Sequence, residues 1–149
     1  MRAVIQRVDR ASVTVEGVIT GKIERGLLVF LGVGENDSEG DISYMVNKIT
    51  GLRIFPDEEG KMNLSVLDLG FEILVVSQFT LYGSVKKGFR PSFTFAASPR
   101  KGEDYYEKFC NEVERMGLIV QKGIFGAMMD VDLLNKGPVT ILIDSEKSF

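Results

Sequence analysis

The first third of the chain shows the alternation of apolar and polar residues that is typical of strands. Residues 3–8, AVIQRV, alternate in this way, and residues 12–20, SVTVEGVIT, predict two short strands around a turn at Glu16–Gly17. Residues 26–33, GLLVFLGV, are apolar without interruption, which favours a strand covered on both faces. We therefore expect a sheet that begins near the N-terminus.

Two later segments have the spacing of amphipathic helices. The first has apolar residues at i, i+3, i+4 and i+7 from Ile42, and Ser38 with Asp41 before it has the spacing of a capping pair. The second begins at Ser98–Pro99, where proline suits the first helical position, and ends at Gly117. Its apolar face consists of Tyr106, Phe109, Cys110 and Val113. The place of Cys110 on this face indicates a buried structural thiol rather than a nucleophile.

The stretch EILVVSQFTLYG, Glu72 to Gly83, starts like a buried strand and turns polar before its strand-forming residues end. We expect one long strand over residues 70–83. Its polar residues Ser77, Gln78 and Thr80 fit either of two interpretations. The strand runs out into solvent, or its end lines a site where polar groups meet at the mouth of an apolar scaffold.

Two more strands are predicted, at residues 118–123 and 137–144. Many strands with two separated helices predict an α+β fold, in which a mainly antiparallel sheet closes into a barrel-like core with two principal helices. The length of 149 residues, without repeats or linkers, predicts a single domain over residues 1–149.

Composition restricts the chemistry. The chain has no histidine and one cysteine, which excludes a Ser-His-Asp triad, a Cys-His pair and an intrachain disulfide. No acidic cluster has the spacing of a metal site, so we expect neither metal nor cofactor. No signal peptide and no apolar run of membrane-spanning length is present, and a cytoplasmic protein without membrane contact is the default expectation.

Charge is unevenly distributed. The net charge is −3, yet no acidic residue lies between Glu72 and Glu103. That interval contains Lys86, Lys87, Arg90, Arg100 and Lys101, with Phe89, Phe93 and Phe95 between them. Basic residues interleaved with aromatic ones suit contact with a nucleotide or nucleic acid. A solvated loop with core phenylalanines explains the same pattern equally well.

Gly137–Pro138, in NKGPVTILID, stands at the start of a predicted strand. Proline there removes only one ladder donor, and glycine permits unusual backbone angles, so turn chemistry alone accounts for the pair.

Four motifs in order resemble the D-aminoacyl-tRNA deacylase family over the whole chain. They are SQFTL at Ser77–Leu81, GFRPSF at Gly88–Phe93, GIFGAMM at Gly123–Met129 and NKGPVT at Asn135–Thr140, and the opening MRAVIQRV is similar as well. Lys136 stands where family members often carry an acidic residue.

The resemblance implies a cytoplasmic esterase that hydrolyses D-aminoacyl-tRNA, and mischarged glycyl-tRNA, as a homodimer with active sites at the subunit interface. By the same resemblance Ser77, Gln78, Phe79 and Thr80 line the reaction centre. Gly137 and Pro138 form a Gly-cis-Pro element that reaches into the partner's pocket and excludes L side chains. The terminal adenosine is expected at Phe125, Gly126 and Ala127, with Arg7 bracing the Gly-Pro loop. The charge pattern supports this function independently, because the basic segment with Lys86, Lys87 and Arg90 offers a place for the acceptor phosphates of tRNA.

Three alternatives stay open. One alternative is a non-catalytic RNA-binding module that uses the basic segment, and another is an esterase for small D-amino-acid esters. Within the deacylase interpretation, Thr80 is a nucleophile, or backbone amides at Phe79 and Thr80 stabilise the intermediate while the substrate's 2′-OH relays the proton. The absence of histidine and of an obvious base beside Thr80 favours the second mechanism.

Overall fold

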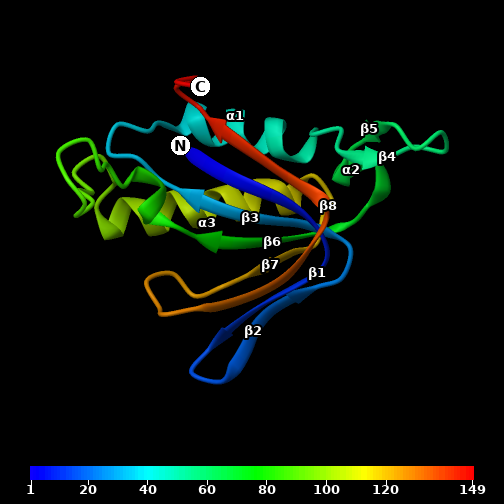
Figure 1. Ribbon diagram of the computed structural model, residues 1–149, viewed down its shortest axis with the longest axis horizontal. Coiled ribbons are helices and arrows are strands. Elements are labelled where there is room, and N and C mark those ends of the chain that lie inside the picture. Colours follow the sequence, from blue (N-terminus) through cyan, green and yellow to red (C-terminus); the bar gives the residue numbers. More distant parts are fainter.

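The first strand, β1 (Arg2–Val15), is the centre of the main sheet in the computed structural model, which describes residues 1–149. Along one edge β1 pairs antiparallel with β2 (Val18–Ile23) and with β3 (Gly26–Gly32). Along its other edge it pairs antiparallel with β8 (Asp130–Asp144), so two strands far apart in the sequence lie side by side (Figure 1). The short strands expected over residues 3–8 and 12–15 are thus one continuous strand.

The sheet is mainly antiparallel, as predicted, but two parallel pairings that the sequence did not predict make it mixed. Beyond β3 it continues into β6 (Glu72–Ser77) and β7 (Val120–Lys122), and both of these pairings are parallel. Parallel neighbours need a long crossover, and the two principal helices lie in these crossovers. Residues 27–29 and 73–76 are buried, as their unbroken apolar runs predicted.

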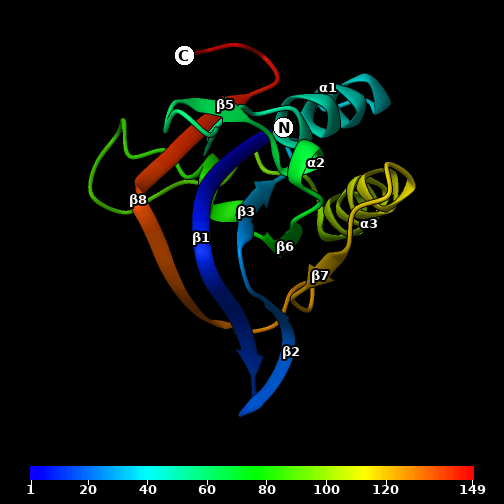
Figure 2. The same cartoon turned by 90° about the vertical axis from the view of Figure 1, so that its right-hand side faces the viewer.

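Both principal helices cover the same face of the sheet and contact each other (Figure 2). They are α1 (Glu39–Thr50) and α3 (Pro99–Arg115), and the predicted capping pair of Ser38 and Asp41 is confirmed. The main core lies between them and the sheet, and Cys110 is fully buried in it. Burial raises the pKa of the Cys110 thiol to about 12, consistent with a structural thiol.

The sheet curls until it is nearly closed, as the barrel-like prediction anticipated. A second apolar cluster, which includes Ala11, Leu28 and Val76, is separate from the main core. Strand β2 approaches β7 so closely that a Cβ at Gly21 would lie 2.6 Å from the carbonyl oxygen of Lys122. Small elements that the sequence did not predict separate α1 from β6: β4 (Phe55–Pro56), β5 (Met62–Leu64) and α2 (Val66–Leu69).

The strand expected over residues 70–83 ends earlier than predicted. Strand β6 stops at Ser77, and the chain turns into a 3₁₀ helix, η1 (Phe79–Tyr82). The Gln78 N–H donates to the carbonyl oxygen of Leu31 at 2.8 Å, and the Gln78 carbonyl then accepts from Leu81 N–H. Apolar composition continues through this turn because Tyr82 is buried there, which is why the sequence pattern resembled a strand.

Strand β8 is longer than predicted and is interrupted by a bulge. Between the pairs Gln6–Thr140 and Val8–Asn135, β1 advances by two residues and β8 by five. The segment Lys136–Val139 therefore leaves the ladder, and the Asn135 side chain closes it by accepting from Val139 N–H at 2.8 Å. Gly137 and Pro138 are both exposed on this bulge.

None of the helices is long and apolar enough to cross a membrane. No three His, Cys, Asp or Glu side chains gather in a group able to hold a metal ion.

Candidate active site

A cavity of about 730 Å³ lies where β6 gives way to η1. It is lined by two segments that only the family resemblance assigned to one site, Ser77–Thr80 and Phe125–Ala127. The rest of its lining comes from β3, the loop before α3, the first turns of α3 and the segment before and at the start of β8. These residues are Leu31, Val33, Val76, Phe93, Ala96, Ala97, Pro99, Gly102, Tyr106, Met128, Met129 and Val131.

Helix α3 supplies one wall of the cavity. Tyr106 is buried, and its hydroxyl donates to the Val75 carbonyl oxygen of β6 at 2.9 Å. Burial raises the Tyr106 pKa well above its usual value, so the group stays protonated at neutral pH. The centroids of the Phe125 and Tyr106 rings lie 6.0 Å apart. A Cβ at Gly102 would lie 3.1 Å from the Phe125 ring. Glycine at 102 thus permits Phe125 to pack against the helix.

The rim of the cavity is apolar and exposed. Phe79 is 59% exposed and Met128 is 92% exposed, although both are large hydrophobic residues. The Phe79 ring packs edge-on against the Phe93 ring at a centroid distance of 5.0 Å. Exposed apolar side chains around a pocket are typical of a surface that a ligand or partner covers.

Polar groups in the cavity are few and uncharged. Gln78 Nε2 donates to Thr80 Oγ1, and Tyr106 is the only titratable residue in the lining. Neither a carboxylate nor an amine therefore stands beside Thr80 to remove its proton. The first N–H groups of η1 belong to Phe79 and Thr80, and the first amides of a helical turn have no partner within that turn.

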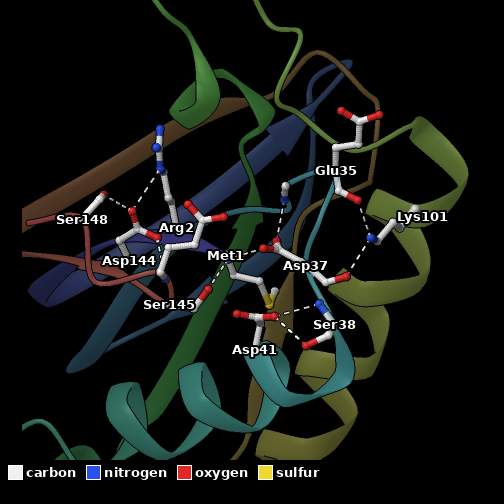
Figure 3. Close-up of polar contacts among 12 residues, drawn as sticks. Met1, Arg2, Glu35, Asp37, Ser38, Asp41, Lys101, Asp144, Ser145 and Ser148 are labelled. Atoms are coloured by element: carbon white, nitrogen blue, oxygen red, sulfur yellow. Dashed lines mark hydrogen bonds and ion pairs between the residues drawn. The ribbon is translucent and has the colours of Figure 1, made fainter.

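A polar cluster ties the N-terminus and the loop after β3 to Lys101 at the start of α3 (Figure 3). The Met1 ammonium group contacts Asp37 Oδ1 at 2.6 Å with both groups buried, and Asp37 Oδ2 accepts from Gly34 N–H. Lys101 Nζ donates to the carbonyl oxygens of Glu35 and Asp37 at 2.6 and 2.7 Å. Glu35 N–H in turn donates to the Phe95 carbonyl oxygen, so the cluster supports the loop that carries Ala96 and Ala97.

Gly137, Pro138 and Arg7 do not line this cavity; they lie at the bulge of β8. The Gly137–Pro138 peptide bond is cis, and Gly137 has a φ of +133°, which an L side chain rarely adopts. Arg7 donates from Nε to the Lys136 carbonyl oxygen at 3.0 Å and from Nη1 to the Ile54 carbonyl oxygen at 2.7 Å. Arg7 therefore holds the base of the bulge.

Lys86, Lys87 and Arg90 lie on an exposed loop beyond η1 and outside the cavity. The loop is closed by reciprocal backbone hydrogen bonds between Ser84 and Ser92, at 2.8 and 2.9 Å. Phe89 at its tip is fully exposed. Because Phe93 lines the cavity, the basic loop begins and ends beside the candidate site.

Sequence reasoning missed several wall residues. Met128 and Met129 stand inside the GIFGAMM motif without an assigned role, and a Cβ at Gly123 would lie 2.5 Å from the Met129 sulfur. The glycine spacing of that motif was the available signal for a tightly packed turn. The sequence predicts a helix that includes position 102 and has Tyr106 on its apolar face, but no local pattern indicates that this helix also borders a cavity.

Comparison with known proteins gives a consistent result. Residues 4–144 match the family model described as D-Tyr-tRNA(Tyr) deacylase. The chain is 60% identical to the D-aminoacyl-tRNA deacylase of Halothermothrix orenii over the full length of both chains. It is 58% identical to that of Aquifex aeolicus over 99% of each chain.

Solved structures share the fold. A structure titled c-Myc DNA Unwinding Element Binding Protein is 44% identical, with a TM-score of 0.91 over 97% of this chain and 98% of that one. A probable eukaryotic D-amino acid tRNA deacylase, at 21% identity, has a TM-score of 0.81 over 95% and 97% of the two chains, which concerns the fold alone. On the family match and the full-length relatives together, the chain belongs to the D-Tyr-tRNA(Tyr) deacylase family.

Proposed function

We propose that this protein hydrolyses the ester bond that joins a D-amino acid to the terminal adenosine of tRNA, and that it accepts mischarged glycyl-tRNA as well. The observation that carries the proposal is the single cavity in which Ser77–Thr80 faces the Phe125–Ala127 segment. One segment offers polar groups and oriented amides, and the other offers apolar surface for an adenine ring. Because its substrate is tRNA, we place the activity in the cytoplasm.

The amides of Phe79 and Thr80 stabilise the tetrahedral intermediate in this proposal. Attack of water on the ester carbonyl puts negative charge on its oxygen, and backbone N–H groups fixed at the start of η1 meet that charge without reorganising. The hydrogen bond from Gln78 Nε2 to Thr80 Oγ1 holds the turn in place.

The substrate itself moves the proton. Tyr106 is the only titratable group in the cavity lining, and its hydroxyl is occupied by the Val75 carbonyl oxygen. The 2′-OH of the terminal ribose is adjacent to the ester and within reach of both the attacking water and the leaving 3′-oxygen. We assign the proton relay to this group and a positioning role to Thr80.

The bulge of β8 supplies stereoselectivity in a homodimer. Gly137–Pro138 is exposed and lies outside the cavity of its own subunit, while the cavity rim exposes Phe79 and Met128. If each subunit inserts its bulge into the cavity of the other, both the exposed bulge and the exposed apolar rim become buried. The inserted backbone then occupies the side on which an L side chain would project. The glycyl group of glycyl-tRNA has no side chain and therefore still fits.

The basic loop with Lys86, Lys87 and Arg90 contacts the phosphates of the acceptor end in this proposal, because it adjoins the cavity through Phe93. A purely RNA-binding role would use the same loop but would not need the cavity.

One assay tests the proposed function. Amino-acid release is measured from D-aminoacyl-tRNA, L-aminoacyl-tRNA and glycyl-tRNA, with a small D-amino-acid methyl ester alongside. We expect turnover of the D and glycyl substrates and little of the L substrate or the methyl ester. Binding of all the tRNAs without release would support the RNA-binding role, and equal turnover of the methyl ester would support a small-ester esterase.

A further inference from the structure

A second, smaller cavity of about 150 Å³ lies at the base of the β8 bulge. It is lined by Arg7, Val8 and Asp9 of β1, Arg25 of the β2–β3 turn, Phe55 and Pro56 of β4, and Lys136 of the bulge. Three of these seven residues are cations and one is an anion. A small concave surface with an excess of positive charge is suited to an anion.

Asp9 neutralises only part of this charge. Its Oδ1 lies 3.8 Å from Arg25 Nε and its Oδ2 lies 3.5 Å from Lys136 Nζ, so one carboxylate bridges two cations. Arg7 has no carboxylate partner at all, because it donates only to the carbonyl oxygens of Lys136 and Ile54. Arg25 and Lys136 are 60% and 65% exposed and remain accessible to a ligand.

The cations are held in place by the fold. The Arg25 guanidinium stacks over the Phe71 ring at 5.1 Å, and Arg7 is fixed by two main-chain acceptors on different segments. Lys136 is the first residue of the bulge and stands directly before Gly137. The charged cavity therefore adjoins the base of the bulge, to which Arg7 is hydrogen-bonded.

We propose that this cavity binds a phosphodiester of the 3′-terminal CCA strand of the substrate bound to the opposite subunit. The inference rests on the proposed function, since it requires the bulge to enter the partner's cavity with the ester beside it. A terminal adenosine in that cavity leaves its 5′-phosphodiester at the rim, where the bulge enters. Lys136 and Arg25 then supply charge-assisted contacts to the phosphate oxygens, and the main chain of the bulge stays free to select chirality.

The test compares two substrates that differ in phosphate. D-Tyrosyl adenosine carries the ester and the 2′-OH without phosphate, and D-tyrosyl-CpCpA adds the phosphodiesters. We expect the wild-type protein to have the higher kcat/KM on the trinucleotide. In Lys136→Glu and Arg25→Glu this advantage falls about tenfold or more, the size of one charge-assisted contact. The slope of log KM against log salt for the trinucleotide weakens by about 0.7 for each phosphate that the variant no longer neutralises.

Arg10→Glu is the matched control. Arg10 also lies on β1, is 53% exposed and pairs with Asp132 outside the cavity, so it makes the same charge change without touching the site. We expect it to retain the preference for the trinucleotide. Lys136→Ala, with a thermal melt for each variant, keeps the test informative if a charge reversal unfolds the protein.

The outcomes are distinct. Full D-tyrosyl-tRNA is assayed alongside, and failure of the wild-type protein to cleave it overturns the proposed function itself. Cleavage with an unchanged trinucleotide preference in Lys136→Glu, Lys136→Ala and Arg25→Glu overturns the phosphate site alone. Inorganic phosphate at constant ionic strength should raise KM for the trinucleotide only, because it competes with the phosphodiester for the cavity. An equal rise in KM for the adenosine ester, which has no phosphate, would mean that the effect does not involve a contact to the substrate strand, and would overturn the assignment.

Discussion

Gly102 illustrates how a single residue shapes the cavity. It lies within α3, where glycine lowers helix stability by about 1 kcal/mol relative to alanine. In Gly102→Ala the new Cβ would stand 3.1 Å from the Phe125 ring and push it toward the cavity. We expect a melting temperature that is unchanged or higher, together with a lower kcat/KM on D-aminoacyl-tRNA.

The control for Gly102→Ala is Gly40→Ala in α1. Its Cβ would meet only Ser38 Oγ at an ordinary 3.5 Å, and it lies outside the cavity. We expect the melting temperature of Gly40→Ala to change as that of Gly102→Ala does, while its kcat/KM stays at the wild-type value. Full activity of Gly102→Ala would show that the position of Phe125 does not matter to the substrate.

The two mechanisms, a proton relay through the substrate 2′-OH and a nucleophilic Thr80, predict opposite effects of removing each hydroxyl. If the 2′-OH relays the proton, a substrate ending in 2′-deoxyadenosine should bind normally and turn over about 10²–10⁴-fold more slowly, the usual cost of removing a positioned proton-transfer group. Thr80→Ala should keep substantial activity, because it removes only the acceptor for the Gln78 side chain. Single-turnover rates measure both. Rapid turnover of the deoxy substrate with an inactive Thr80→Ala protein would assign the nucleophile to Thr80.

At the scale of elements, local pattern predicted what depends on local contacts. The helices from residue 39 and from Pro99 and the buried runs in β3 and β6 follow from residue spacing and caps. The end of β6 could not be predicted in this way, because Phe79 and Tyr82 are apolar residues that suit a strand as well as the 3₁₀ helix in which they lie. The bulge of β8 and the parallel pairings depend on partners far away in the sequence, which local residue spacing does not identify.

The same limit applied to the site. The end of β6 and the segment after β7 could be placed in one site only through the family resemblance, since they are nearly fifty residues apart. The wall contributed by α3 stayed hidden because a helix face that borders a cavity has the same apolar spacing as one that borders a core.

The loop that carries Lys86 and Lys87 gives a prediction about an element. Replacing both by glutamate should weaken tRNA binding and flatten its salt dependence, because fewer phosphates are neutralised. The fold should be unaffected, since both side chains are exposed. The matched control is Lys22→Glu with Lys48→Glu, two exposed lysines on β2 and α1. Equal weakening in both double variants, measured by salt titration of binding, would mean that net charge alone matters.

For the whole molecule, a shared active site predicts complementation between two inactive variants. One subunit carries Gly102→Trp, which fills the cavity but leaves the bulge intact. The other carries Gly137→Val, which clashes with Arg7 at a backbone angle that valine rarely adopts but leaves the cavity intact.

Mixing and refolding the two should restore about a quarter of wild-type activity. Half of the dimers are hybrids, and each hybrid has one intact site of two. Co-refolding of each variant with itself provides the control. No recovery in a mixture shown to contain hybrid dimers would mean that each subunit is catalytically complete.

The pairing of β1 with β8 also has a consequence for the order of events during synthesis. Pairs such as Arg2–Asp144 join β1, which leaves the ribosome before the other strands of this sheet, with β8, which leaves it after them. Contacts of such long sequence separation slow folding, and until β8 arrives the long edge of β1 is open to other chains. We expect fragments released after Met129 to aggregate, which light scattering would detect, whereas the full-length chain buries that edge as soon as its final strand is available.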